Sequence, residues 1–394
     1  QIDPKFGTLD DAKELVKKAH DLGMYVILDG VFGHHATSGT IPASPSGYTV
    51  VGSNPVSYPA SLNFYKEVAT YWIDTLEIDG WRLDQAYQVS KKNQSQNYWK
   101  DIRETIEAKC AARKAAGKQW GTLGYMVGEI WDGETNIQKW GYDAAGNMGL
   151  KSCFEFPLRY ALVTVLAAKE HTDEANYKAQ PASTLNATYN KIKAAYSSFA
   201  QPNLFLTNHD LVRFGDLIQR AGYGGKETEG YWKRYKAATM FMTAFTGPIT
   251  LYYGDEIGDE TPGVVGMNSG GYYDDTVART NGQITGFDAK QQDLHDYVVT
   301  LMKLRDTHPA LWRGVRTNII RDSATIYADL KTDSTEKVFY IMNVAETAST
   351  VAVAQTSIGG TTLTDLITGK TVTASGGSYS ISVDGLSGRL LQVK

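Results

Sequence analysis

Apolar runs of strand length alternate with amphipathic segments through most of the chain. In residues 8–23, Thr8 can cap a helix, acidic residues follow in its first turn, and Gly23 can end it. The apolar run at residues 24–32 comes directly afterwards and has the length of a strand. A helix joined to an apolar run without polar alternation is typical of a parallel sheet covered on both faces.

Five more runs of this kind follow, at residues 78–86, 124–131, 152–158, 203–210 and 248–256. Helical periodicity lies between them, for example at residues 64–76 and 231–245. Alternating strands and helices build either an open, doubly wound sheet or a closed (β/α) barrel.

Charged or imidazole side chains stand at the ends of five of these six runs. They are Asp29 with His34, Asp84, Glu129, Asn208 with His209 and Asp210, and Asp255 with Glu256. A capping or turn role can explain any one of them, but not the whole set. A barrel collects all its strand ends at one mouth, whereas an open sheet concentrates function at a switch point. The pattern therefore favours a (β/α)8 TIM barrel.

The expected barrel is incomplete in this chain, because six strands are visible and a closed barrel of this type has eight. The first residues also look like a loop leading into a helix. We therefore expect about two βα units upstream of Gln1, either removed or supplied as a separate N-terminal segment that completes the barrel. Residues 33–62, rich in Gly, Pro and Ser, are expected to form a small excursion after what would be the third barrel strand.

The pattern changes after a long helix expected at residues 289–306. Short β-rich segments separated by turn residues follow, and helical periodicity disappears. This predicts an antiparallel β-sandwich. With the boundary near Trp312, residues 1–312 would form the barrel and residues 313–394 a C-terminal domain.

Composition narrows the classes of function. The 394 residues carry a formal net charge of -4, which gives no electrostatic case for nucleic acid or an anionic membrane as partner. No run of about 18 apolar residues could span a bilayer. The modest lysine content, with many Thr, Ser and Tyr residues, points to a secreted or periplasmic location.

Asp84 and Glu129 are carboxylates at the ends of neighbouring strands. In such a pair, one carboxylate can attack an anomeric carbon while the other protonates the leaving oxygen, and a spacing of about 5–5.5 Å makes the reaction retaining. Arg82 shares a strand face with Asp84 and would keep it ionised, because a nearby cation favours the charged carboxylate. The alternative is a buried structural ion pair between Arg82 and Asp84.

Four segments, in order, resemble the signature regions of the α-amylase family, glycoside hydrolase family 13. They are DGVFGHH at residues 29–35, GWRLD at 80–84, GEIW at 128–131 and FLTNHD at 205–210. The resemblance covers essentially the whole chain. It implies that Asp84 is the nucleophile, that Glu129 is the general acid/base, and that Asp210 is a third carboxylate which holds sugar hydroxyls and stabilises the transition state.

The resemblance also implies a set of substrate-binding residues: His34, Arg82, His209, Trp131 and Tyr87. The two histidines would bind the sugar ring at the cleavage subsite, Arg82 would orient Asp84, and Trp131 would line the acceptor side of the cleft. Both histidines can instead be satisfied structural groups, and Trp131 can be a buried aromatic residue. Asp29 would fix the architecture of the mouth.

Two regions depart from the family pattern. Gly33 stands where the family usually has Asn, and Tyr87 with Gln88 stand where it often has Lys-His. In many amylases that Asn side chain and the backbone at that His help to hold a structural calcium ion. Ca²⁺ thus stays open as a cofactor, with oxygen ligands to come from residues 33–62 or from an upstream segment.

The leading hypothesis is retaining endo-hydrolysis of α-1,4-glucosidic bonds in starch, glycogen or maltodextrins. A cyclomaltodextrinase, α-glucosidase or glucanotransferase of the same family would share every catalytic residue. A glucan-binding protein without catalysis is the hypothesis from another class. Three converging carboxylates argue against it, since they cost stability that a binding protein need not bear.

Overall fold

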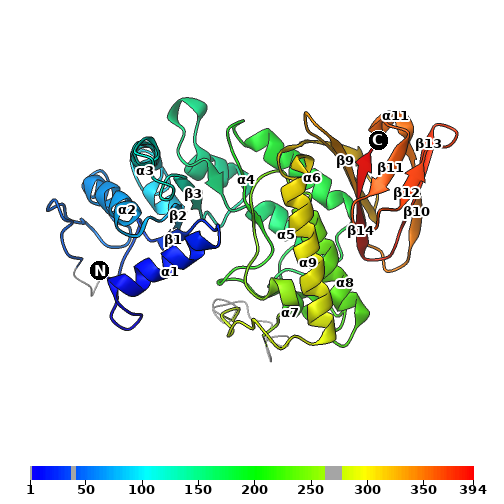
Figure 1. Ribbon diagram of the computed structural model, residues 1–394, viewed down its shortest axis with the longest axis horizontal. Helices are drawn as coiled ribbons and strands as arrows, with labels where there is room; N and C mark the ends of the chain where they lie inside the picture. The colour runs from blue at the N-terminus through cyan, green and yellow to red at the C-terminus, as the bar shows by residue number, and fades with distance from the viewer. Residues whose placement is uncertain (1, 37–40, 262–276) are drawn as a thin grey trace. The chain divides into compact units, whose positions relative to one another are not determined.

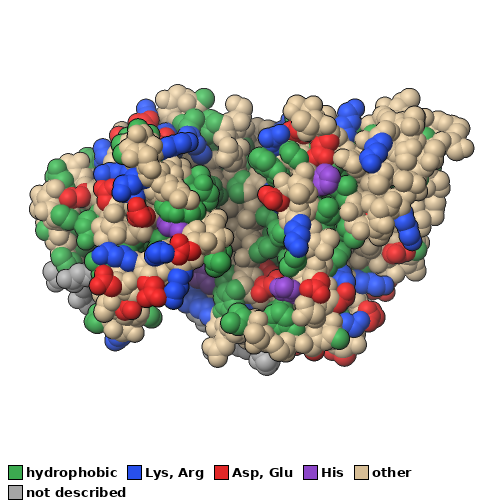
Figure 2. All heavy atoms as spheres, in the orientation of Figure 1, with side chains coloured by type: hydrophobic (Ala, Val, Ile, Leu, Met, Phe, Trp, Pro, Cys, Tyr) green, Lys and Arg blue, Asp and Glu red, His purple; other side chains and the backbone are tan. Residues whose placement is uncertain are grey.

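The computed structural model describes residues 2–36, 41–261 and 277–394 of the chain (Figure 1). The chain divides into two compact units. The first comprises Gln1–Phe154 with Ala195–Pro202, and the second comprises Glu155–Ala194 with Asn203–Lys394. Within the described residues, no helix is both long and apolar enough to cross a membrane. On the face shown in Figure 2, acidic and basic side chains are interspersed on each unit.

The first unit is built on a parallel sheet with the strand order β1-β2-β3-β4. Its strands are β1 (Ile27–Gly30), β2 (Gly80–Leu83), β3 (Tyr125–Gly128) and β4 (Ser152–Cys153). Its helices are α1 (Leu9–Asp21), α2 (Leu62–Leu76), α3 (Trp99–Ala115) and α4 (Glu134–Ile137), with short turns η1 (Ala86–Val89), η2 (Gln138–Tyr142) and η3 (Ala145–Asn147). Each strand coincides with part of a predicted apolar run.

Helix α1 begins as the sequence predicts. The Thr8 side chain accepts a hydrogen bond from the backbone of Asp11, and the Asp11 side chain accepts one from the backbone of Thr8, so the capping box is complete. Of its side chains, Val16 and His20 are buried. The Nε2 atom of His20 lies 2.9 Å from Oδ2 of Asp79, just before β2, which fixes the helix against the sheet.

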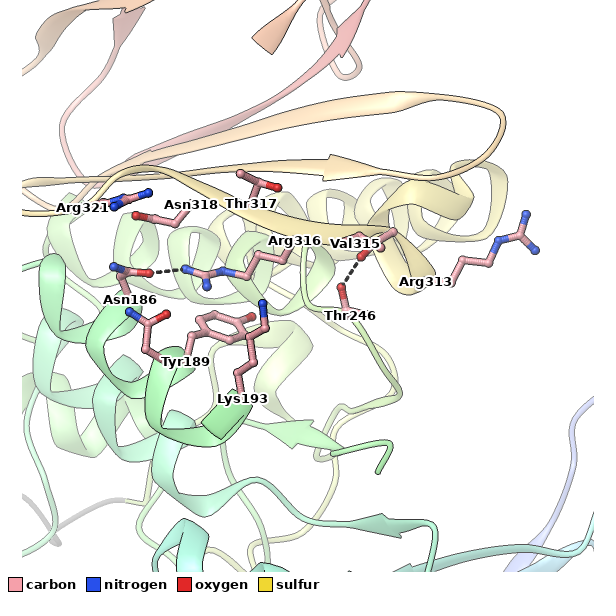
Figure 3. Close-up of a pocket in the computed structure, with 12 residues that line it drawn as sticks. Asn186, Tyr189, Lys193, Thr246, Arg313, Val315, Arg316, Thr317, Asn318 and Arg321 are labelled. Atoms are coloured by element: carbon pink, nitrogen blue, oxygen red, sulfur yellow. Dashed lines mark hydrogen bonds between the residues drawn. The ribbon is translucent and has the colours of Figure 1, made fainter. Parts of the chain in front are cut away.

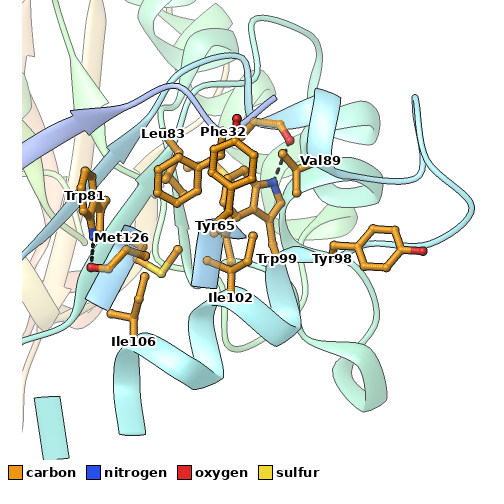
Figure 4. Close-up of a cluster of buried hydrophobic side chains, with 14 of the residues drawn as sticks. Phe32, Tyr65, Trp81, Leu83, Val89, Tyr98, Trp99, Ile102, Ile106 and Met126 are labelled. Atoms are coloured by element: carbon orange, nitrogen blue, oxygen red, sulfur yellow. Dashed lines mark hydrogen bonds between the residues drawn. The ribbon is translucent and has the colours of Figure 1, made fainter. Parts of the chain in front are cut away.

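Strands β2 and β3 approach so closely that only glycine fits at position 80. A Cβ atom placed on Gly80 would lie 1.9 Å from the carbonyl oxygen of Tyr125. Aromatic side chains pack beside this pair, where the ring of Phe32 lies 5.4 Å from Trp81 and 6.0 Å from Trp99, measured between centroids (Figure 4). The indole of Trp99 donates a 2.7 Å hydrogen bond to the carbonyl of Ala86, so the core holds the turn that follows β2.

The backbone ladder continues past the ends of the strands. The amide of Asp84 donates to Gly30 O at 3.1 Å, and the amide of Glu129 donates to Leu83 O at 2.9 Å. Both residues are therefore fixed by main-chain bonds at the C-terminal edge of the sheet. This is the edge at which parallel α/β folds place their sites.

The second unit begins with alternating helices and strands. It contains α5 (Phe156–Leu166), α6 (Ser183–Ala195), β5 (Leu204–Phe205), α7 (Phe214–Arg220), α8 (Glu229–Thr243), β6 (Ile249–Thr250), η4 (Asp255–Ile257), α9 (Ala289–Thr307) and α10 (Pro309–Arg313). Strands β5 and β6 pair in parallel. The predicted run at residues 152–158 is only partly strand, because α5 begins at Phe156. Glu155 caps that helix and Pro157 lies in its first turn, where proline is favoured.

Antiparallel strands make up the rest of the second unit. One sheet has the order β12-β11-β14-β9-β8-β7, and β10 pairs with β13. The elements are β7 (Val315–Ile320), β8 (Ile326–Thr332), β9 (Lys337–Asn343), β10 (Ser349–Ala354), α11 (Gln355–Ile358), β11 (Thr362–Asp365), β12 (Thr371–Thr373), β13 (Ser378–Val383) and β14 (Ser387–Val393). Their apolar side chains, including Phe339, Tyr379 and Ile381, form one buried cluster.

A cavity of about 620 Å³ lies between α6 and β7 within the second unit (Figure 3). Its wall includes Arg316, whose guanidinium lies 4.0 Å from the ring centroid of Tyr189. Arg316 also donates to Asn186 at 2.8 Å and to Asp329 at 2.7 Å. These protein partners engage the cation and tie α6 to the antiparallel sheet.

Candidate active site

The guanidinium of Arg82 joins three carboxylates in the first unit. Its Nη1 atom lies 2.9 Å from Oδ1 of Asp29 and 2.7 Å from Oδ1 of Asp84, and its Nη2 atom lies 2.9 Å from Oε1 of Glu129. Sheet register accounts for this arrangement, because Asp29 and Arg82 are direct partners in the β1–β2 pairing. The prediction that Arg82 and Asp84 share a strand face is confirmed.

These groups are largely withdrawn from solvent. The side chains of Arg82, Asp84 and Glu129 are 12%, 18% and 6% exposed, whereas that of Asp29 is 53% exposed. Burial alone would lower the pKa of Arg82, but the charges of Glu129 and Asp29 raise it by more, so the guanidinium stays charged. Arg82 is therefore a permanent cation between the two predicted catalytic carboxylates.

Gln85, the residue after Asp84, has a left-handed backbone conformation, with φ 39° and ψ 52°. Its amide donates to Oε2 of Glu129 at 3.2 Å, and its side-chain oxygen accepts from the hydroxyl of Tyr87 at 2.6 Å. A non-glycine residue in this region costs about 1–3 kcal/mol. This role cannot be predicted from the sequence, because nothing in the pattern distinguishes Gln85 from an ordinary turn residue.

His34 faces Asp84 from the loop after β1. Its Nε2 atom lies 3.6 Å from Oδ2 of Asp84, and its Nδ1 atom lies 2.8 Å from Oε1 of Gln88. The structure thus brings His34 together with the carboxylates, as the sequence predicts. The sequence does not predict the contact with Gln88, which arises only from folding.

Tyr87 and Trp131 follow the ends of β2 and β3. The ammonium of Lys92 lies 4.0 Å from the centroid of the Tyr87 ring. Trp131 is 47% exposed. The alternative that Trp131 is a buried aromatic residue is therefore wrong.

His209 and Asp210 belong to the second unit, after β5. The Nε2 atom of His209 lies 3.1 Å from Oδ2 of Asp210, and Nη2 of Arg279 lies 2.8 Å from Oδ1 of Asp210. The Nε atom of Arg279 also donates to the carbonyl of His209 at 3.1 Å. Asp210 thus has its own arginine partner. The sequence prediction did not include Arg279, which lies about 70 residues further along the chain, outside any motif.

The environments of Asp255 and Glu256, the acidic residues after β6, are those of structural groups. Glu256 accepts a hydrogen bond from the amide of Gly254 at 2.8 Å, as a turn carboxylate does. Asp255 is buried, and this burial raises its pKa to about 7.

Among the described residues, no cluster of three or more His, Cys, Asp or Glu side chains has a geometry suited to a metal ion. Near Gly33 and Gln88, the side-chain oxygens of Gln85, Gln88 and Asn54 accept or approach hydrogen-bond donors of the protein. The positions that depart from the family's calcium pattern, Gly33 and Gln88, therefore lie at a network of side-chain amides.

Comparison with known proteins places the chain in a family. The family model of the alpha-amylase catalytic domain matches residues 1–42 and 58–314. The crystal structure of AmyP in complex with maltose superposes with a TM-score of 0.92 at 44% sequence identity, covering 100% of this chain and 79% of that one. Such a likeness confirms the predicted fold class, a TIM barrel with a C-terminal antiparallel β-sandwich.

Curated relatives are more distant in sequence. The cyclomaltodextrinase of Geobacillus thermopakistaniensis is 26% identical over 97% of this chain and 62% of its own length. The alpha-amylase of Streptomyces lividans is 24% identical over 92% of this chain and 47% of its own. The chain spans less than two thirds of the length of either relative. From the family model and the AmyP likeness, the chain belongs to the alpha-amylase family of glycoside hydrolases, glycoside hydrolase family 13.

Proposed function

We propose that this protein hydrolyses α-1,4-glucosidic bonds in starch, glycogen or maltodextrins, with retention at the anomeric carbon and cleavage inside the chain. Asp84 is the nucleophile and Glu129 is the general acid/base. The observation that carries the proposal is the single guanidinium of Arg82, which bonds both carboxylates at neighbouring strand ends. Residues 1–312 serve as the catalytic part, and residues 313–394 as a C-terminal domain.

The first half of the reaction forms a glycosyl-enzyme. A carboxylate oxygen of Asp84 bonds to the anomeric carbon while Glu129 donates a proton to the departing glycosidic oxygen, so the C–O bond breaks without leaving an alkoxide. Glu129 is the most deeply buried of the three carboxylates that contact Arg82, with 6% of its side chain exposed.

The second half releases the sugar. Glu129, now ionised, takes a proton from water, and the water oxygen bonds to the anomeric carbon as the ester to Asp84 breaks. Two displacements at one carbon restore its configuration. The family resemblance assigns to Asp210, which has His209 and Arg279 at its side, the role of the third carboxylate, which binds sugar hydroxyls and stabilises the positive charge of the transition state.

α-Glucans are supported as the substrate class by the relatives, since AmyP binds maltose and a variant of it was crystallised with maltotriose. The choice between an endo-acting amylase and a cyclomaltodextrinase rests on products. An endo-acting enzyme lowers the iodine colour of starch early, while few reducing ends have formed. Faster cleavage of a cyclic maltodextrin than of starch would contradict the endo-acting proposal and favour the second candidate, a cyclomaltodextrinase.

The catalytic assignment is tested by Asp84→Asn, with hydrolysis and maltooligosaccharide binding measured on the same sample. We expect hydrolysis to be abolished and binding to persist, because the amide keeps the shape of the side chain but is a poor nucleophile. Asp10→Asn is the matched control, since Asp10 is a surface residue of α1 with 92% of its side chain exposed. Hydrolysis by Asp84→Asn at the wild-type rate would refute the mechanism.

A further inference from the structure

Position 33 has no room for a ligating side chain. A Cβ atom built on Gly33 would lie 2.5 Å from Cβ of Gln88 and 2.7 Å from its Oε1 atom. Any side chain at position 33 would therefore begin inside space that Gln88 occupies. Calcium needs six to eight oxygen ligands at about 2.3–2.6 Å. The Gln88 side chain occupies the space beside position 33, so the arrangement of these two residues does not fit an ion held between them.

Gln88 uses both ends of its amide in this place. Its Oε1 atom lies 2.8 Å from Nδ1 of His34, and its Nε2 atom donates to Oδ1 of Asn54 and Oε1 of Gln85, each at 3.2 Å. Gln88 is buried, with 6% of its surface exposed. One side chain thus connects the loop after β1, the excursion and the turn after β2.

Gln94 makes a second connection between the same segments. Its Nε2 atom donates to the carbonyl of Val56 at 2.9 Å and to that of Gln88 at 2.8 Å, and its Oε1 atom accepts from the amide of Tyr58 at 3.2 Å. Val56 and Tyr58 are buried. Backbone groups that burial would otherwise leave without partners are therefore bonded by this amide.

We propose that Gln88, seated against Gly33, and Gln94 together form a metal-independent cross-link that holds residues 54–58 to the end of β2 and sets the His34 ring. The hydrogen bonds of Gln94 hold Val56 and Tyr58 to the backbone of Gln88. The side chain of Gln88 in turn contacts the His34 ring. Two glutamine amides make this connection with hydrogen bonds to backbone and side-chain groups of one compact unit.

The cross-link also fixes which nitrogen of His34 carries a proton. The Oε1 atom of Gln88 can only accept, so Nδ1 of His34 is the donor and Nε2 is the atom turned toward Asp84. Gln88 is accordingly a positioning residue for the sugar contact of His34. This part of the inference rests on the proposed function, whereas the tie to residues 54–58 does not.

The first test uses the wild-type protein and needs no activity. The melting temperature and the rate of proteolysis within residues 41–61 are measured after exhaustive treatment with EGTA and again with added CaCl2. We expect both to be the same in the two conditions. Stabilisation by Ca²⁺, or loss of protection in EGTA, would overturn the inference.

The second test replaces Gln88 by methionine, which has a similar volume but no amide. Gln88→Met should lower the melting temperature by about 2 °C or more and should speed cleavage within residues 41–61. Gln119→Met is the matched control, since Gln119 is exposed and lies after α3 in the same unit. Identical behaviour of the two variants would overturn the cross-link.

The third test separates positioning from folding. Gln88→Glu keeps an oxygen acceptor for Nδ1 of His34 but has no donor for Asn54. Below the melting temperature, Gln88→Met should lower kcat/KM by about tenfold to a hundredfold, while Gln88→Glu should recover part of it and stay sensitive to protease. Equal kcat/KM in both variants would overturn the positioning role. A wild-type protein inactive on α-glucans would instead refute the proposed function, leaving the first two tests valid.

Discussion

The Nη2 atom of Arg82 lies 2.9 Å from Oε1 of Glu129, so this arginine serves the carboxylate of the neighbouring strand as well as Asp84 on its own strand. The resemblance implies that Arg82 orients Asp84, and the structure adds Glu129 as a second partner of the same guanidinium. A planar guanidinium can offer separate N–H groups to separate carboxylates, which an ammonium group cannot do with the same geometry. Arg82 therefore fixes the two proposed catalytic groups relative to one another.

Removing this cation should cost both stability and activity. Arg82→Met leaves carboxylates close together in a largely buried site, and we expect a loss of about 3 kcal/mol or more at neutral pH. The loss should shrink as the pH falls, because protonation relieves the repulsion. Urea unfolding at several pH values measures this. Arg82→Lys keeps the charge and should recover stability better than kcat/KM, and equal recovery of both would contradict the role of the fork geometry.

Asp255 should make the protein less stable as the pH rises. Its folded-state pKa is about 7, against about 3.9 for an ordinary aspartate, so the folded state holds a proton that the unfolded chain releases between these values. Stability is then lost over this window, by up to about 4 kcal/mol. Asp255→Asn should match the wild type near pH 4 and exceed it at pH 8. A constant difference across this range, in thermal melts, would contradict the prediction.

Lys331 should act in the opposite direction. Burial lowers its folded-state pKa to about 7, so the unfolded chain binds a proton between pH 7 and the usual value near 10.4, and stability rises with pH there. Lys331→Met should therefore stabilise the protein at pH 6, by an amount on the order of 1–4 kcal/mol. The gain should vanish toward pH 10. A gain that does not depend on pH would point to packing instead of charge.

Gly80→Ala should disrupt the pairing of β2 with β3. Its Cβ atom would meet the backbone oxygen of Tyr125 at 1.9 Å, and a backbone atom in a sheet cannot move aside cheaply. We expect a loss of about 3 kcal/mol or more, or failure to fold. Gly133→Ala is the control, because no atom lies within 4 Å of its added Cβ. Similar stabilities of the two variants in urea would show that the sheet tolerates the change.

The order of the elements could be predicted because periodicity reports burial directly. The apolar runs that became β1, β2 and β3 lie between helices with clear apolar faces, and the capping box at Thr8 marks a helix start in the sequence itself. The run at residues 152–158 is expected to be a strand, but its second half belongs to the buried helix α5. Both halves are equally apolar. Apolar composition alone does not separate the two, and the cap at Glu155 decided the outcome.

The site was predictable where it depends on strand alternation, and not where it depends on turns. Period-two geometry is enough to put Arg82 and Asp84 on one face. The left-handed Gln85 and the contact of Gln88 with His34 arise from how segments far apart in sequence pack together. Arg279, partner of Asp210, is likewise joined to its site only by folding.

The contact between Gly33 and Gln88 has a consequence for how this family can vary. Because the two positions share one volume, neither can change freely while the other stays as it is. In relatives that carry a side chain at position 33, we expect a residue other than glutamine, and a displaced backbone, at position 88. The two sites would then be inherited as a linked pair, and lineages with glycine at one should keep glutamine at the other.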